Sequence, residues 1–382
     1  MLEDFLNNKP LFYDEIDYTR MPRVYNRIKK HFDLKQVIHI IGTNGKGTTG
    51  RFLATALYKL GYSTAHYTSP HILSFNERIW FNGENVSMEH LEETHQVLLK
   101  ILTEDEVKSL SYFEYTTLLA MLFFSHRSDF IILEAGLGGE HDATAVFTND
   151  LTLITPIDKD HEAFLGDNIL KIAQTKLNAI QKKAIIARQK HSSVYDILQT
   201  IVNEKNIEAY TLESLLQQSD YEKIETIAKH ELLAPYLKDN LSLAIAALRL
   251  FGIEYSCSDF YDAKLFGRLT YLSENIIVDV GHNVLAAQSI VASLPKRQYT
   301  LIYNSYKDKN YKEILTILKP IIKNVELIDV YNNRIAESSY LQNCLDELDI
   351  EWNKFQKIKQ EEFYLVFGSF SVIEAFLRRA DG

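Results

Sequence analysis

The stretch VIHIIGTNGKGTTGRFLATALYKLGY, residues 37–62, contains the strongest fold signal in the chain. A short apolar run rich in β-branched residues leads into a glycine-rich loop, Gly42–Thr48, and an amphipathic helical pattern then continues to Gly61. Glycines allow a loop to turn its backbone N–H groups around phosphate oxygens, while the N-terminus of the helix adds partial positive charge. Lys46 adds a full charge. This order of strand, loop, lysine and helix predicts a P-loop that binds the phosphates of a nucleotide.

The loop departs from the general P-loop pattern in two ways. The spacing before Gly45-Lys46 is shortened, and Gly47 separates the lysine from Thr48. These departures indicate a particular branch of the P-loop fold, and the alternative is an ordinary glycine-rich turn between a strand and a helix. The residues expected to contact the phosphates of the nucleotide are Thr43, Asn44, Gly45, Lys46, Gly47 and Thr48.

The rest of the chain alternates between short apolar runs and segments with helical spacing. The apolar runs lie at 65–67, 130–133, 151–155, 184–187, 276–280, 300–304, 325–330 and 363–367. The helical segments lie at 112–125, 169–181, 240–251, 284–293 and 311–318, and the pattern is weaker and more polar between about 190 and 235. This alternation predicts parallel sheets covered by helices. We therefore expect a larger N-terminal α/β domain, 1–262, and a smaller C-terminal α/β domain, 263–382, with ligands in the cleft between them.

The composition limits the partners that the chain can have. With 382 residues and 46% hydrophobic content, the chain is long enough for two folded domains. Its net charge of −10 argues against a general nucleic-acid binder. The two cysteines, Cys257 and Cys344, form no CxxC pattern, which indicates a reducing compartment and no thiolate metal site. Because no signal-like or membrane-length apolar segment occurs, we expect a cytoplasmic protein without a membrane partner. We also expect a monomer, and no nucleic-acid partner.

Three more of the expected strands end in polar residues that suit a metal ion. These residues are Ser69, Glu134 and His161, each at or just after the end of an apolar run. One such residue alone would more often be structural, but three of them beside a P-loop indicate a Mg²⁺ site. The histidine is the least usual ligand, because Mg²⁺ prefers oxygen. Lys176, on the next expected helix, has the pattern of an ordinary solvated lysine.

Together with several others, these segments closely resemble the folylpolyglutamate synthase/dihydrofolate synthase family, which is related to the Mur ligases. The matching segments are GTNGKGTT (42–49), YTSPHILSFNERI (67–79), SYFEYTT (111–117), LEAGLGGEHDAT (133–144), DHEAFLGD (160–167), FGRL (266–269), DVGHN (279–283), DKN (308–310) and VFGSF (366–370). They occur in the family's order, and the resemblance covers nearly the whole chain. TSPH, NER and YFE are much more specific than GTNGKG, which the Mur relatives share.

The resemblance implies a Mur-ligase-like P-loop domain followed by a smaller, Rossmann-like α/β domain, and it implies roles for individual residues. The implied catalytic residues are Lys46, Glu134, His161 and Lys176, of which Lys176 matches a lysine that is carbamylated in this family. The implied metal residues are Ser69, Glu134 and His161, and the implied distal ATP contacts are Asn240, Arg268 and Asp279. The implied substrate-site residues are Ser111, Tyr112, Phe113, His141, Asp142, Ala143 and His282. Tyr112 and Phe113 also fit an ordinary helix start, and His282 also fits a loop histidine with a local hydrogen bond.

The chain departs from the family pattern at several positions. Glu140 stands where the family usually has arginine, and Ala145 stands where it has asparagine. Tyr236-Leu237 replaces His-Gln, and the segment around Lys176 reads TKLNAI where EKAGII is typical. Because Glu140 removes a cation that could hold a glutamate tail, we expect ligation to dihydropteroate to exceed the extension of reduced folates.

The activity that the resemblance implies is an ATP-dependent joining of a carboxylate to an amine. L-glutamate would be added to dihydropteroate or to reduced folates through an acyl phosphate, with ATP and Mg²⁺ required. Two alternatives stay open. A Mur-type ligase would normally carry a UDP-sugar domain before the P-loop, and here 41 residues precede Gly42. A P-loop regulator without ligase activity would need no second α/β domain that supplies an arginine and an aspartate to ATP.

Overall fold

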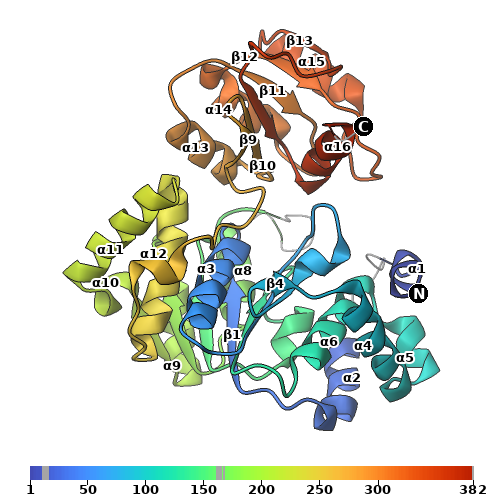
Figure 1. The fold of residues 1–382 in the computed structure, drawn as a ribbon, viewed down its shortest axis with the longest axis vertical. Coiled ribbons are helices and arrows are strands. Elements are labelled where there is room, and N and C mark those ends of the chain that lie inside the picture. Colours follow the sequence, from blue (N-terminus) through green and yellow to red (C-terminus); the bar gives the residue numbers. More distant parts are fainter. Residues whose placement is uncertain (11–16, 161–165, 167, 381–382) are drawn as a thin grey trace. The chain divides into compact units, whose positions relative to one another are not determined.

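The computed structural model describes residues 1–10, 17–160, 166 and 168–380. The chain forms two compact units (Figure 1), which are described separately below. Unit 1 comprises Met1–Leu233 and Leu237–Ala263, and unit 2 comprises Ala234–Tyr236 and Lys264–Gly382.

Unit 1 is built on one large sheet with helices on both faces. Its helices are α1 (Leu2–Asn7), α2 (Arg20–Ile28), α3 (Lys46–Lys59), α4 (Met88–Ile101), α5 (Glu104–Ser109), α6 (Tyr112–Phe124), α8 (Ile169–Leu177), α9 (Ser193–Lys205), α10 (Leu212–Leu215), α11 (Gln218–His230) and α12 (Pro235–Leu250), whose first two residues group with unit 2. Its strands are β1 (Gln36–Ile41), β2 (Thr64–Tyr67), β3 (Ile79–Phe81), β4 (Glu84–Asn85), β5 (Phe130–Glu134), β6 (Leu151–Ile154), β7 (Lys183–Ile186) and β8 (Glu208–Thr211). Short 3₁₀ turns lie at η1 (Lys29–His31), η2 (Phe75–Arg78), η3 (Ala143–Val146) and η4 (Cys257–Phe260).

The sheet of unit 1 places the P-loop strand at its centre. The strand order is β4-β3-β2-β5-β1-β6-β7-β8, and all neighbours are parallel except the β2–β3 and β3–β4 pairs. In the register, Ile40 of β1 lies opposite Glu134 of β5, and Ile41 lies opposite Ile154 of β6. Because parallel strands end at one edge of a sheet, the loops after β1, β5 and β6 lie next to each other.

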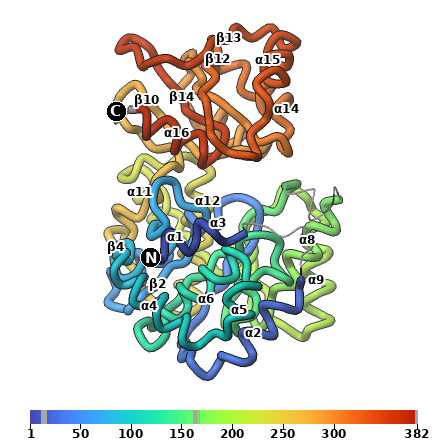
Figure 2. Tube along the Cα trace, turned by 90° about the vertical axis from the view of Figure 1, so that its right-hand side faces the viewer, coloured from blue at the N-terminus to red at the C-terminus, as the bar shows by residue number. Residues whose placement is uncertain are grey.

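Strand alternation decides which helix covers which face of this sheet. Ala65 and Tyr67 of β2 pack with buried residues of α4 and α6 in one apolar cluster, which also includes Leu2 and Leu6 of α1. Figure 2 shows α1 near α4 in this part of the chain. His66 points to the other face, where Arg51 of α3 donates from Nε to its Nδ1 at 3.5 Å. The helix after the P-loop therefore covers the face opposite to α4 and α6.

Unit 2 is a smaller α/β layer structure. Its strands are β9 (Thr270–Ser273), β10 (Ile276–Asp279), β11 (Tyr299–Tyr303), β12 (Ile322–Leu327), β13 (Trp352–Lys354) and β14 (Tyr364–Phe367). Its helices are α13 (Val284–Ser293), α14 (Tyr311–Leu318), α15 (Ser338–Glu347) and α16 (Phe370–Ala380), with η5 at Lys319–Ile321. The sheet order is β13-β12-β11-β14-β10-β9, and β9 alone among these described strands is antiparallel to its neighbour.

The sequence-based predictions of strands and helices are confirmed wherever the apolar pattern was strong. The sheets are mainly parallel, as expected, and antiparallel pairing among the described strands is limited to β3 and β4 at one side of the first sheet and to β9 at the edge of the second. The stretch from about 190 to 235 is regular structure, because it holds α9, β8, α10 and α11, whose exposed polar faces hide the apolar periodicity. The expected division into 1–262 and 263–382 stays a prediction.

Among the described helices, none combines the length and the apolar character that a bilayer span requires.

A buried carboxylate joins two helices of unit 1. The side chain of Asp220 on α11 is fully buried and accepts from Arg249 on α12, with Nη2–Oδ1 at 2.8 Å and Nε–Oδ1 at 3.0 Å. The Tyr255 hydroxyl donates to the same carboxylate at 2.6 Å, and the Gln217 backbone N–H donates at 2.8 Å. These contacts satisfy the charge that burial would otherwise make costly.

We expect Asp220→Asn to lower the free energy of unfolding by about 3 kcal/mol, because it leaves a half-buried arginine beside a neutral group. The measurement is urea denaturation followed by circular dichroism at neutral pH. The matched control is Glu213→Gln, since Glu213 accepts from Arg188 at 3.0 Å in a pair that is exposed on both sides. The control substitution should lower the free energy of unfolding by less than about 1 kcal/mol. Equal losses in the two variants would contradict the role given to Asp220.

Candidate active site

Two glycines fix the shape of the loop between β1 and α3. Gly42 has φ +137°, and a Cβ at this position would lie 2.0 Å from Thr155 Oγ1. Gly45 has φ +91°, and a Cβ there would lie 2.3 Å from Asn240 Oδ1. Both positions combine a positive φ with a close approach, so only glycine fits. The loop therefore passes close to the end of β6 and to Asn240, a buried residue of α12.

The loop is also held by hydrogen bonds to the segment after β6. The Thr43 backbone N–H donates to Pro156 O at 2.9 Å, and its hydroxyl donates to Asp158 O at 2.9 Å. The same hydroxyl accepts from the Asp158 N–H at 3.0 Å. The side chain and the backbone N–H of Thr43 therefore both hold the loop in place. Asn44 follows in the same loop, while Gly47 and Thr48 lie in the first turn of α3.

Two lysines meet at the carbonyl oxygen of Gly42. Lys176 Nζ of α8 donates to it at 3.0 Å, and Lys46 Nζ of α3 lies 3.4 Å from the same oxygen. Lys176 is buried, so the solvated position that its sequence pattern predicts is wrong. Burial and the charge of Lys46 lower the pKa of Lys176 to about 7, while Asp160 and Asp142 oppose the shift. A large fraction of Lys176 is therefore a neutral amine near neutral pH.

Glu134, at the end of β5, lies beside these lysines. Its Oε2 accepts from the Thr68 hydroxyl and, at 3.1 Å, from the Ser69 backbone N–H. Its Oε1 lies 3.9 Å from Lys46 Nζ. The loop after β2 thus fixes the carboxylate in orientation, and one of its oxygens faces the P-loop lysine.

The described residues fit a divalent cation that keeps other oxygen ligands. Thr48 Oγ1 is buried and has no hydrogen-bond partner among the described residues, and Glu134 and Ser69 lie on neighbouring strand ends. No group of three His, Cys, Asp or Glu side chains comes together in the described part of the chain. Mg²⁺ matches this arrangement, because it commonly takes one or two carboxylates and fills its shell with water and phosphate oxygens. His161 lies outside the described residues.

The segment after Glu134 connects that carboxylate to the lysine helix. The Glu140 N–H donates to Thr175 O at 2.9 Å, and Asn178 Nδ2 donates to Glu140 Oε2 at 2.8 Å. Glu140 and Asn178 are both departures from the family pattern described above, and they contact each other. Ala145 lies further along this segment, in η3.

The same segment contains the buried residue Asp142. Its carboxylate accepts from the Leu137 N–H at 2.8 Å, the Thr144 N–H at 2.9 Å and the Thr144 hydroxyl. Burial raises the pKa of Asp142, and these hydrogen bonds oppose the rise. Ala143 is buried at the start of η3, whereas His141 is half exposed and packs on the Tyr18 ring at 4.5 Å.

The first turn of α6 carries the other predicted substrate residues. Ser111 caps α6 by accepting from the Glu114 N–H at 3.3 Å. The Phe113 ring lies against the backbone of Gly136, where a Cβ would come within 2.6 Å of it. The Arg78 guanidinium lies 5.2 Å from the centre of the Tyr112 ring. Phe113 therefore lies beside the segment that holds His141, Asp142 and Ala143.

Unit 2 holds Arg268, Asp279 and His282. The buried Asp279 carboxylate accepts from the Leu269 N–H at 2.9 Å, the Gly281 N–H at 2.8 Å and the Tyr236 hydroxyl at 2.9 Å. Burial raises the pKa of Asp279, and Arg268 opposes the rise. Arg268 lies over the Phe370 ring at 5.0 Å, and His282 Nδ1 lies 3.1 Å from Val280 O. The aromatic departure at Tyr236 is thus a direct partner of Asp279.

The structure brings the P-loop, Ser69, Glu134, Lys176 and Asn240 together within unit 1, and it places Phe113 against the segment after β5. Two residues that hold this arrangement were not predicted from the sequence: Thr68, which lies in the TSPH motif, and Asp158, whose backbone holds Thr43. A polar residue directly after an apolar run is the signal that could have identified both.

Several known proteins are similar to this chain over most of its length. No protein-family model matches the chain. A dihydrofolate synthase/folylpolyglutamate synthase of Buchnera aphidicola subsp. Schizaphis graminum is 30% identical over 381 residues, which cover 89% of this chain and 87% of the relative. The corresponding Escherichia coli protein is 31% identical over 372 residues, covering 88% of this chain and 85% of the relative.

Solved structures give the same result. A folylpolyglutamate synthetase from Helicobacter pylori superposes with a TM-score of 0.80 at 36% identity, covering 100% of this chain and 98% of that one. Escherichia coli FolC in complex with DHPP and ADP superposes with a TM-score of 0.80 at 26% identity, covering 99% and 96%. In fold and in sequence over nearly its whole length, this chain belongs to the dihydrofolate synthase/folylpolyglutamate synthase family of ATP-dependent ligases.

Proposed function

We propose that this chain joins L-glutamate to the carboxyl group of dihydropteroate or of a reduced folate, with cleavage of ATP to ADP. The observation that carries the proposal is the meeting of Lys46 and Lys176 at Gly42 O, beside the fixed carboxylate of Glu134. Such a site suits phosphate oxygens that must approach a second anion. The complex of the FolC relative with DHPP and ADP supports the same assignment.

Each group of predicted residues receives a role in this proposal. The backbone of Gly42–Thr48 and the Lys46 ammonium hold the phosphates, and Asn240, Arg268 and Asp279 contact the remainder of ATP. Ser69 and Glu134 form the described part of a Mg²⁺ site, to which His161 would contribute. Bound there, Mg²⁺ would neutralise charge on phosphate oxygens. The substrate site takes Ser111, Tyr112, Phe113, His141, Asp142, Ala143 and His282.

The chemistry that these residues serve has two steps. A carboxylate oxygen of the substrate attacks the γ-phosphorus of ATP, the bond to the β–γ bridging oxygen breaks, and ADP leaves with the electron pair. The glutamate ammonium first loses a proton, and the neutral amine then attacks the acyl carbon; the bond from that carbon to the phosphate oxygen breaks, and phosphate leaves with the second proton of the amine nitrogen as the amide forms. Lys46 lowers the repulsion between the phosphate oxygens and the carboxylate in the first step. We place this reaction in the cytoplasm, consistent with free Cys257 and Cys344, and we expect a monomer.

Purified protein with ATP, Mg²⁺ and L-glutamate should release ADP when dihydropteroate or a reduced folate is added. Because Glu140 binds Asn178 and supplies no cation for a glutamate tail, dihydropteroate should be the better substrate. Product mass at equal substrate concentrations measures whether glutamate is joined and which of the two substrates is better. Product from reduced folate with none from dihydropteroate would reverse this ranking, and no glutamate-dependent ADP release with either substrate would refute the proposed function.

Lys46→Met should lower the rate of ligation by at least about a hundredfold, since it removes a charge that faces phosphate oxygens. The control is Lys59→Met at the other end of α3, where Nζ donates to Tyr261 O at 2.7 Å and Ser258 O at 3.3 Å. Circular dichroism should show both variants folded, with ligation retained in the control. Wild-type turnover in Lys46→Met would exclude the phosphate role.

Lys176 should react with carbon dioxide, because the neutral amine attacks the carbon and releases a proton to form an anionic carbamate. With a pKa of about 7, the reactive form becomes dominant as pH rises through that value. After addition of ¹³C-bicarbonate, a carbamate signal in ¹³C NMR should increase between about pH 6 and about pH 8, well below the ordinary range of a lysine amine. The signal should be absent from Lys176→Ala. Its absence from the wild-type protein at the higher pH would count against carbamylation.

A further inference from the structure

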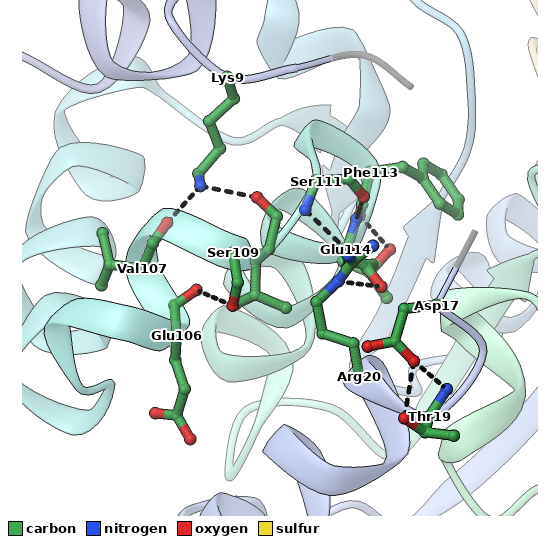
Figure 3. Close-up of polar contacts among 12 residues, drawn as sticks. Lys9, Asp17, Thr19, Arg20, Glu106, Val107, Ser109, Ser111, Phe113 and Glu114 are labelled. Carbon is green, nitrogen blue, oxygen red and sulfur yellow. Dashed lines mark hydrogen bonds and ion pairs between the residues drawn. The ribbon is translucent and has the colours of Figure 1, made fainter. Parts of the chain in front are cut away.

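Lys9 is a buried lysine just after α1, and its ammonium lies at the C-terminal end of α5 (Figure 3). Nζ donates to Val107 O at 2.5 Å and to Leu110 O at 2.8 Å. It also lies 5.0 Å from the centre of the Phe5 ring and 5.1 Å from that of Tyr115. Burial lowers the pKa of Lys9 to about 8, and the attraction of Glu114 opposes this shift. The two carbonyl oxygens and the two ring faces thus compensate the cost of holding the Lys9 charge away from water.

The end of α5 needs such a partner. The last carbonyl groups of a helix have no partner inside the helix, and α5 is only 6 residues long. Lys9 supplies donors to two of these carbonyls from a segment about a hundred residues away in sequence. The next residue continues the contact, because Pro10 O accepts from the Tyr112 N–H at 3.0 Å. Lys9 and Pro10 therefore hold the junction between α5 and α6 at consecutive points.

A second contact holds the same turn of α6 from α2. Arg20 donates to Glu114 from Nε at 3.2 and 3.0 Å, and its Nη2 lies 2.9 Å from Oε2. Glu114 Oε2 accepts from the Ser111 N–H at 2.8 Å, and the Glu114 N–H donates to Ser111 Oγ. Figure 3 shows Arg20, Glu114, Ser111 and Phe113 close together at the start of this helix. The arginine therefore fixes the turn from one side while Lys9 fixes the junction that precedes it.

We propose that Lys9 is a positioning residue for the substrate side of the active site, which holds the first turn of α6 in place through Leu110. The inference rests on the proposed function, which places Ser111, Tyr112 and Phe113 against the pterin. Among the described contacts of Lys9, none is to those three side chains. Its effect travels through the backbone of Leu110 and Tyr112, on either side of Ser111, which are both hydrogen-bonded to the Lys9–Pro10 segment.

The first test measures position without any substrate. In Lys9→Met, amide hydrogen exchange at Tyr112–Tyr115 should become about tenfold faster, because the junction loses its outside donors. The matched control is Lys223→Met, since Lys223 also donates to a carbonyl, Tyr255 O at 2.9 Å, and lies 4.2 Å from an aromatic ring. The control should leave exchange at these amides unchanged. Unchanged exchange in Lys9→Met, or equal acceleration in both variants, would overturn the proposal.

The second test measures substrate binding. Lys9→Met should raise the KM for dihydropteroate about tenfold while the KM for ATP stays within about twofold, and Lys9→Arg should restore most of the loss. Equal rises for both substrates would mean a general loss of structure and would overturn the proposal. If Lys9→Met does not fold, Lys9→Gln carries both tests with the same expected directions. Wild-type protein that makes no product refutes the proposed function, while the exchange experiment still decides whether Lys9 positions α6.

Discussion

The site depends on the repulsion between two ammonium groups that share one acceptor. Lys46 and Lys176 both lie at Gly42 O, in a place that is largely shielded from water. Two like charges so close are unfavourable in a medium of low dielectric, and the lowered pKa of Lys176 is one expression of this cost. Phosphate oxygens or a carbamate reduce the same cost. The two lysines thus form a site whose positive charge is stabilised when an anion binds.

The geometry that brings the two lysines together comes from backbone constraints of unit 1. β1 lies between β5 and β6, so the loops that follow these strands converge at one edge of the sheet. Gly42 can approach Thr155 because it has no side chain, and Thr43 then bonds to the backbone of Asp158. Glu134 is fixed separately, by the hydroxyl and the N–H of the loop after β2. Each part of the site is thus held by its own contacts with the segments that follow the strands.

Much of this arrangement could be predicted from the sequence, because the signals are local. An apolar run followed by GTNGKGTT defines a strand, a loop and a helix within some twenty residues, and Glu134 marks the end of another apolar run. The burial of Lys176 could not be derived from its pattern, because its surroundings come from β1 and the segment after β5. The contacts of Lys9 and Arg20 could not be predicted for the same reason, since their partners lie more than ninety positions further along the chain.

The hydrogen bond between Asn178 and Glu140 has a consequence for comparisons among relatives. Each of the two residues differs from the pattern of the family, and each provides the other's partner across the gap between the segment after β5 and the end of α8. Returning Glu140 alone to arginine or Asn178 alone to glycine would leave the other side chain without this hydrogen bond, whereas returning both would leave no side chain at position 178 that needs it. In chimaeras of this chain and its relatives, the residues at positions 140 and 178 should therefore be exchanged together.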